Sequence, residues 1–145
     1  MAGIIFSILA GMALSLQGVF NTRLGEKVGL YESNLLVQGM AFLLSCVAFL
    51  ILGKGSFAAL RETNRVYLLG GVLGILITLF VMLGIGNLSP TVSISLILVS
   101  QLLVAAIIDA FGWFGAEKAP FRLPQYIGLA LMIGGILVFK LRMKQ

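Results

Sequence analysis

Residues 89–112 read SPTVSISLILVSQLLVAAIIDAFG, and this stretch decides the fold. Ser89 can cap the N-terminus of a helix, and Pro90 suits the first helical position because its missing N–H would have no partner there. About 20 helical residues at roughly 1.5 Å each cover the hydrocarbon core of a bilayer, which is about 30 Å thick. We therefore predict a transmembrane helix over residues 90–111, with Gln101 near its middle.

The whole chain is too apolar for a soluble domain. Of its 145 residues, 60% are hydrophobic and 10% are charged, and the mean hydropathy is +1.12. Soluble domains hold about 45 to 50% apolar residues. Long apolar runs between short polar breaks favour helices, because a membrane barrel would alternate polar and apolar residues. We expect an all-α integral membrane protein, a single transmembrane domain over residues 1–145 with helices at about 3–20, 35–52, 66–88, 90–111 and 124–141.

The residue types argue against several classes of function. The chain holds no histidine, no clustered carboxylates and no phosphate-binding loop, so we expect no enzyme activity, no metal site and no cofactor. Cys46 is the one cysteine and cannot form an intrachain disulfide. The net charge of +5 comes from basic residues scattered over short loops and the C-terminus. This scatter argues against nucleic acid as a partner and for contact with membrane lipid.

Two of the expected helices carry a face of small residues. At about 100° per residue, one face of the first span collects Ser7, Gly11, Ser15, Gly18 and Thr22. One face of the third span collects Gly70, Gly71, Gly74 and Thr78. Small residues let membrane helices approach closely, so the positions expected to serve helix packing are Gly11, Gly18, Gly70, Gly71 and Gly74. Close approach of a ligand to the third span is the less common alternative.

The span over residues 90–111 has one polar side. Thr91, Ser95 and Asp109 lie within about 40° of one another around the helix. Gln101 lies about 80° from Asp109. Polar groups in hydrocarbon normally face a bundle interior or water, so this side predicts a cavity wall. Gln101 is the preferred solute contact because it is deep and offers both a donor and an acceptor, while an interhelical hydrogen bond worth about 1 kcal/mol is the competing explanation.

Three further polar positions have two interpretations each. Asp109 falls near the membrane surface, where it is either an interfacial acid, paired with Lys118 or Arg122, or a group that gates or couples transport. Gln17 and Asn21 share one face of the first span. They either bind solute or hydrogen-bond to neighbouring helices and headgroups.

The numbers of lysine and arginine residues on the two sides of the membrane govern how a chain inserts. The side of the N-terminus holds Lys54, Arg61, Arg65, Lys118 and Arg122. The opposite side holds Arg23, Lys27, Lys140, Arg142 and Lys144. Five against five gives the insertion machinery no preference, so we expect insertion in both orientations. An antiparallel pair of such chains would reproduce the inverted repeats that many transporters carry within one polypeptide.

A series of polar and glycine positions follows one order along the five spans. It consists of Gln17, Gly18, Asn21, Leu24 and Gly25, then Gly70, Gly71 and Gly74, then Pro90, Gln101, Asp109, Phe111 and Gly112. In this order the chain resembles the YdcZ family, a branch of the drug/metabolite transporter superfamily, over nearly its whole length. The resemblance implies a small transporter of the bacterial inner membrane that works as an antiparallel homodimer or as a heterodimer with a sister chain. The chain would then be half of a ten-helix architecture that dimerisation completes.

The resemblance also bears on the solute. The related small multidrug resistance transporters carry a membrane-embedded glutamate in their first helix, which binds cations and protons. The first span here has Gln17 and no acid, which favours a neutral, zwitterionic or polar solute over cation/proton exchange. The leading hypothesis is a secondary transporter that exports a polar or amphiphilic small molecule, with solute contacts at Gln101, Gln17, Ser93, Ser95, Thr91 and Asn21. A non-transporting membrane subunit and a small channel are the alternatives.

Overall fold

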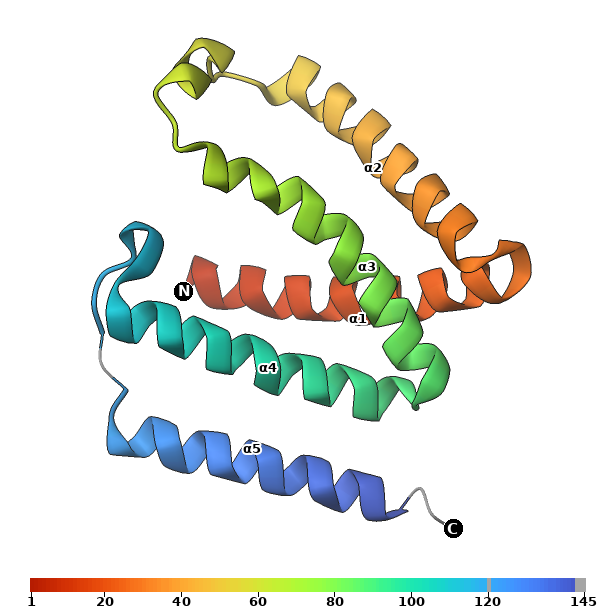
Figure 1. Cartoon of the computed structure of the whole chain (residues 1–145), viewed down its shortest axis with the longest axis vertical. Coiled ribbons are helices and arrows are strands. Elements are labelled where there is room, and N and C mark those ends of the chain that lie inside the picture. Colours follow the sequence, from red (N-terminus) through yellow and green to blue (C-terminus); the bar gives the residue numbers. More distant parts are fainter. Residues whose placement is uncertain (120, 143–145) are drawn as a thin grey trace. The chain divides into compact units, whose positions relative to one another are not determined.

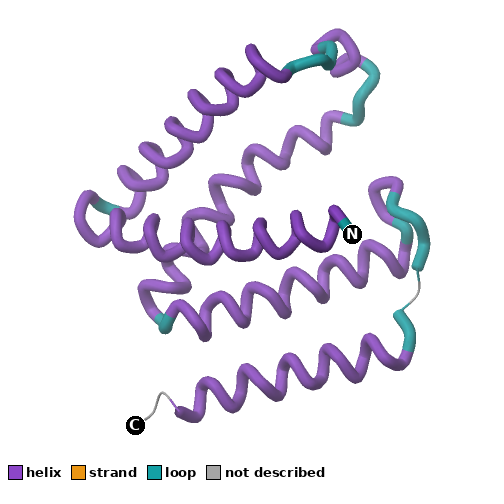
Figure 2. Tube along the Cα trace, turned by 180° about the vertical axis from the view of Figure 1, so that it is seen from behind, coloured by secondary structure: helices purple, strands orange, loops and turns teal. Residues whose placement is uncertain are grey.

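The computed structural model describes residues 1–119 and 121–142, and this part of the chain is helical and contains no strand (Figure 1). Its five α-helices are α1 (Ala2–Val28), α2 (Leu30–Leu52), α3 (Leu69–Asn87), α4 (Pro90–Phe111) and α5 (Leu123–Arg142). Its three 3-10 segments are η1 (Phe57–Arg61), η2 (Arg65–Leu68) and η3 (Trp113–Gly115). Figure 2 shows how short the loops between these elements are. Lys144, one of the basic residues counted above, lies outside the described residues.

The described helices are built to lie in lipid. Four segments are long and apolar enough to cross a membrane, namely Ala2–Val28, Leu30–Leu52, Arg65–Asn87 and Pro90–Phe111. The apolar part of α5, Leu123–Val138, is shorter. Most large apolar side chains are exposed, and the buried ones in the described part are Met82, Ile85, Val92 and Val99. An apolar exterior is expected where lipid is the solvent, and the predicted all-α integral membrane class is confirmed.

The contacts divide the chain into two compact units. The first, Met1–Gly86, holds α1, α2 and nearly all of α3, and the second, Asn87–Gln145, holds α4 and α5. In the first unit α1 packs against α2, and in the second unit α4 packs against α5. The candidate site is therefore described within each unit separately.

The bend between α1 and α2 is one residue long. α1 continues to Val28, well beyond the end expected near residue 20, through a polar run in which Arg23, Leu24, Glu26 and Lys27 are good helix formers. It also carries an ion pair one turn apart, between Arg23 Nη1 and Glu26 Oε2 at 2.9 Å. Gly29 then has φ 103°, which residues with a Cβ rarely adopt, and α2 starts at the next residue. Two long helices therefore meet at a sharp corner.

Local sequence sets both ends of α4. Ser89 Oγ accepts a hydrogen bond from the Val92 N–H at 3.3 Å, and Pro90 occupies the first turn, as the sequence predicts. At the other end Gly112 has φ 67°, the left-handed conformation that commonly terminates helices. These signals fix the ends of α4 and so the positions of its polar side chains along the helix.

Candidate functional site

Four buried polar side chains lie beside the corner in the first unit, and we call them the corner cluster. Asn21 and Thr22 come from α1, and Ser33 and Asn34 come from α2 (Figure 1). Their exposed fractions are 6%, 7%, 0% and 8%, respectively. Polar groups of membrane helices normally face the interior or water, so this cluster is the polar interior of the first unit.

The hydroxyls of the corner cluster are used in hydrogen bonds. The Ser33 Oγ–H donates to the Asn21 carbonyl oxygen at 3.2 Å and ties α2 to α1. The Thr22 Oγ1–H donates to the Gly18 carbonyl oxygen one turn back, at 2.8 Å. Asn34 differs, because its buried Oδ1 accepts no hydrogen bond from the described residues. The cluster therefore contains one acceptor that is free for a further donor.

Glycines of α1 bring α3 close to the corner cluster. A Cβ added to Gly18 would lie 2.9 Å from both Val81 Cγ1 and Ile85 Cδ1. A Cβ added to Gly25 would lie 2.6 Å from Met82 Cε. The glycines permit these contacts, because a Cβ at Gly18 would press on two α3 side chains and a Cβ at Gly25 would push the end of Met82 aside. α1 and α3 are thus in close contact at these two glycines.

The small-residue faces are open at their other ends. A Cβ added to Gly11 of α1, or to Gly70, Gly71 or Gly74 of α3, would meet nothing within 4 Å. Of the five glycines expected to serve packing, Gly18 therefore contacts a neighbouring helix in this structure, and the other four are available to a further surface.

A second polar contact joins α2 to α3. The Gln38 Nε2–H donates to Thr78 Oγ1 at 3.2 Å, and the Thr78 hydroxyl donates to the Gly74 carbonyl oxygen at 3.0 Å. Gln38 lies four residues after Asn34, so the two amides point to nearly the same side of α2. Neither residue was singled out from the sequence. The signal that points to them is the spacing of two amides four residues apart at the start of an apolar run, which hydropathy alone does not detect.

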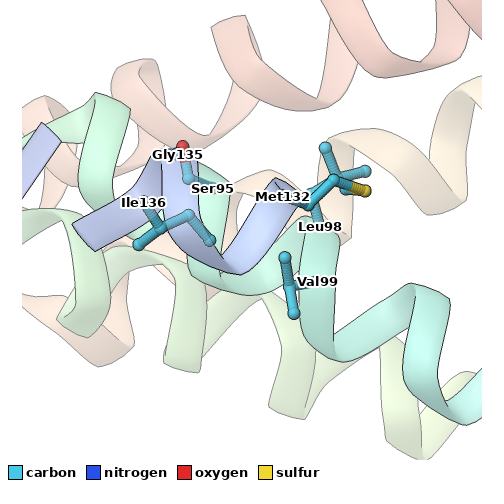
Figure 3. A pocket seen from close by; sticks show the side chains of 6 residues that line it. All are labelled: Ser95, Leu98, Val99, Met132, Gly135 and Ile136. Atoms are coloured by element: carbon cyan, nitrogen blue, oxygen red, sulfur yellow. The ribbon is translucent and has the colours of Figure 1, made fainter. Parts of the chain in front are cut away.

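In the second unit, Ser95 borders an apolar groove between α4 and α5 (Figure 3). The groove measures about 220 Å³ and is lined by Ser95, Leu98, Val99, Met132, Gly135 and Ile136. The Ser95 hydroxyl donates to the Thr91 carbonyl oxygen at 2.7 Å. The groove therefore offers a mostly hydrocarbon wall with one hydroxyl oxygen as a polar group.

The remaining predicted contacts differ in exposure. Ser93 is buried, with 2% of its surface exposed, whereas Thr91 and Gln101 are exposed on α4. Gln17 is exposed on α1, although Asn21 one turn later is buried in the corner cluster. Within each unit, the described residues bring Asn21 into a polar cluster and Ser95 into a groove, and they leave both glutamines on open surfaces.

Asp109 is exposed near the end of α4. Among the described residues, no ion pair joins its carboxylate to Lys118 or Arg122. Its backbone carbonyl accepts a hydrogen bond from the Ala119 N–H at 2.8 Å, which holds the loop after α4 against the helix end. The described carboxylates, thiol and other possible metal ligands form no cluster of three or more. The chemistry on offer is therefore hydrogen bonding and apolar contact.

The comparison with protein families matches residues 2–138 to the family described as "Putative inner membrane exporter, YdcZ". The match covers most of both units and every residue of the corner cluster. No curated protein and no solved structure matches the chain.

Proposed function

The chain belongs to the YdcZ family, and from this premise we propose that it is a small secondary transporter that exports a polar or amphiphilic molecule. The family match over residues 2–138 is the observation that carries the proposal. It makes the chain a multi-pass protein of the inner membrane, in the family described as "Putative inner membrane exporter, YdcZ". The solute and the mode of assembly belong to the proposal.

The proposed working unit is an antiparallel dimer, either of two identical chains or with a sister chain. Gln17 and Gln101 are exposed on helices that are long and apolar enough to cross the membrane. An amide left in hydrocarbon is costly, so membrane helices normally turn such groups toward protein or water. A second copy, inverted in the membrane, would cover these amides and the open glycine faces. The equal numbers of basic residues on the two sides support the same arrangement.

The proposed solute contacts are hydrogen-bonding side chains, namely Gln101, Gln17, Ser93, Ser95, Thr91 and Asn21. α1 has no acid before Glu26, so recognition on this helix rests on hydrogen bonds rather than on charge. This favours a neutral or zwitterionic solute. Asp109 is proposed to gate or couple transport from the end of α4. Rocking about the glycine contacts of α1 and α3 would open and close the corner in turn.

Transport by the purified protein in liposomes tests the function. A panel of polar metabolites should include at least one that moves, and Gln101→Leu should abolish that flux while the helix content by circular dichroism stays unchanged. Leu103→Ala, at another exposed position of α4, is the matched control and should keep the flux. Absence of flux for the whole panel, with Gln101→Leu identical to wild type in every property, would favour a non-transporting subunit.

Reporters fused to the C-terminus test the assembly. A reporter active only in the cytoplasm and one active only in the periplasm should both give signal, because the chain inserts in both orientations. Signal from one compartment alone would reject the antiparallel homodimer and leave a heterodimer with a sister chain of opposite orientation.

A further inference from the structure

Asn34 carries a buried acceptor without a hydrogen bond. Its side chain is 8% exposed, and within the described part of the chain its Oδ1 is the buried side-chain atom that lacks a partner. The hydroxyl hydrogens of the corner cluster are already committed, since Thr22 and Ser33 both donate to backbone carbonyls of α1. Buried polar groups in native proteins are nearly always hydrogen-bonded. The missing donor is therefore expected from another molecule.

We propose that Asn34 binds the transported solute by accepting a hydrogen bond from one of its N–H or O–H groups, so that the corner closes stably around a loaded site. This inference rests on the transport function proposed above and narrows its substrate class. An amide oxygen can only accept, so the solute has to carry at least one hydrogen-bond donor. Molecules whose donors are all methylated are excluded.

A trapped water is a poor candidate for the donor. A buried water makes about three hydrogen bonds to polar groups that are otherwise unsatisfied. Here the described residues offer one such atom, Asn34 Oδ1. Water therefore reaches Asn34 when the corner opens.

In the protein without solute, the unpaired Asn34 oxygen favours the state in which the corner is open over the state in which it is closed. In the open state water supplies the donor, and in the closed empty state the donor is missing. An unsatisfied buried acceptor of this kind shifts such an equilibrium by roughly tenfold. A solute with a donor removes the bias, so a loaded carrier closes more readily than an empty one. This difference favours exchange of solutes over passage of the empty carrier.

Hydrogen exchange of the full-length protein in liposomes, without solute, measures the closure. The Gly29 and Ser33 N–H groups donate to the Gly25 and Gly29 carbonyl oxygens at 2.9 and 3.0 Å on either side of the bend, so an opening of the bend that breaks these bonds speeds their exchange. Asn34→Leu replaces the unpaired acceptor with an apolar group of similar size. Exchange in the peptide 25–33 should then slow by roughly tenfold. Unchanged or faster exchange means that the oxygen has a partner inside the closed protein, and this result overturns the proposal.

Gln38→Leu is the matched control, because it makes the same chemical change one turn farther along α2. It breaks the hydrogen bond from Gln38 to Thr78, which is made in the closed state. Exchange at the corner should therefore become several-fold faster, opposite in sign to the effect at Asn34. If both variants shift exchange in the same direction, a general effect of leucine on α2 explains the data and the proposal fails.

Acetamide and N,N-dimethylacetamide probe the donor requirement. Acetamide has N–H donors and its dimethyl derivative has none. At equal concentration, acetamide should slow corner exchange in the wild type and not in Asn34→Leu, and the dimethyl derivative should slow neither. Equal effects of the two amides, or no effect of acetamide on the wild type, overturn the proposal.

These experiments separate the binding proposal from the transport proposal. Hydrogen exchange at the corner can be measured without any flux. If acetamide slows this exchange but the protein moves no solute, the Asn34 site is supported and the transport proposal fails. A chain that transports a donor-bearing solute equally well with Asn34→Leu keeps the transport function and loses the site.

Discussion

Gly18→Ala should destabilise the first unit, and the contacts around Gly18 set the size of the effect. The added Cβ would lie 2.9 Å from Val81 Cγ1 and from Ile85 Cδ1, closer than such atoms normally approach. Both neighbours are β-branched and stiff in a helix, so overpacking costs about 1 to 3 kcal/mol. Replacing a helical glycine with alanine offsets about 1 kcal/mol of this. The net loss in unfolding free energy should therefore be about 1 kcal/mol.

Two other glycines of α1 provide matched controls. The Cβ of Gly25→Ala would meet Met82 Cε at 2.6 Å, but this atom ends a flexible side chain that can move aside. The Cβ of Gly11→Ala would meet nothing within 4 Å. Equilibrium unfolding in mixed micelles, with SDS as denaturant and circular dichroism as readout, should give Gly18→Ala a lower unfolding free energy than either control. If Gly18→Ala is as stable as Gly25→Ala, the contact between α1 and α3 does not have the geometry described.

Three further predictions concern the corner, the solute and the orientation. Gly29→Ala should lower the unfolding free energy by about 1 to 2 kcal/mol, since φ 103° is strained for alanine; a midpoint equal to that of wild type in the same SDS titration would contradict this. Gln101→Asn keeps the amide and shortens its reach, so transport should weaken in KM more than in kcat; equal flux across all solute concentrations would remove Gln101 from the site. Gly55→Lys with Ser56→Lys adds charge in the loop between α2 and α3, so C-terminal reporters should then signal from one compartment; unchanged dual signal would show that these charges do not govern insertion.

Much of the fold follows from local sequence. The caps at Ser89 and Gly112 and the apolar length of α4 are signals that each lie within a few residues, and the structure uses both caps. The membrane class follows from composition alone, because lipid leaves the helix as the way to satisfy the backbone of long apolar runs.

The sequence predicted a polar contact at Asn21, but the burial of the corner cluster as a whole could not be predicted because it depends on tertiary packing. The stretch from Asn21 to Asn34 lies between the helices expected at about 3–20 and 35–52. α1 nevertheless continues through part of this stretch, to Val28. Met82 and Ile85 of α3 contact α1 at Gly25 and Gly18, on either side of the buried residues Asn21 and Thr22. The positions of Gln17 and Gln101 along their helices could be predicted. Their exposure within each unit could not, since it depends on how the helices of that unit pack.

Gly29 is the single residue between α1 and α2, so a change in its backbone angles would rotate one helix against the other about this point. α1 has 27 residues, which at about 1.5 Å each make a rod of roughly 40 Å. A rotation of about 10° at the corner would displace the far end of such a rod by roughly 7 Å. A movement of this size exceeds the radius of a small metabolite, while the side chains at the corner shift by far less. Breaking or making one hydrogen bond near Gly29 would thus change the access of solute at the opposite surface of the membrane.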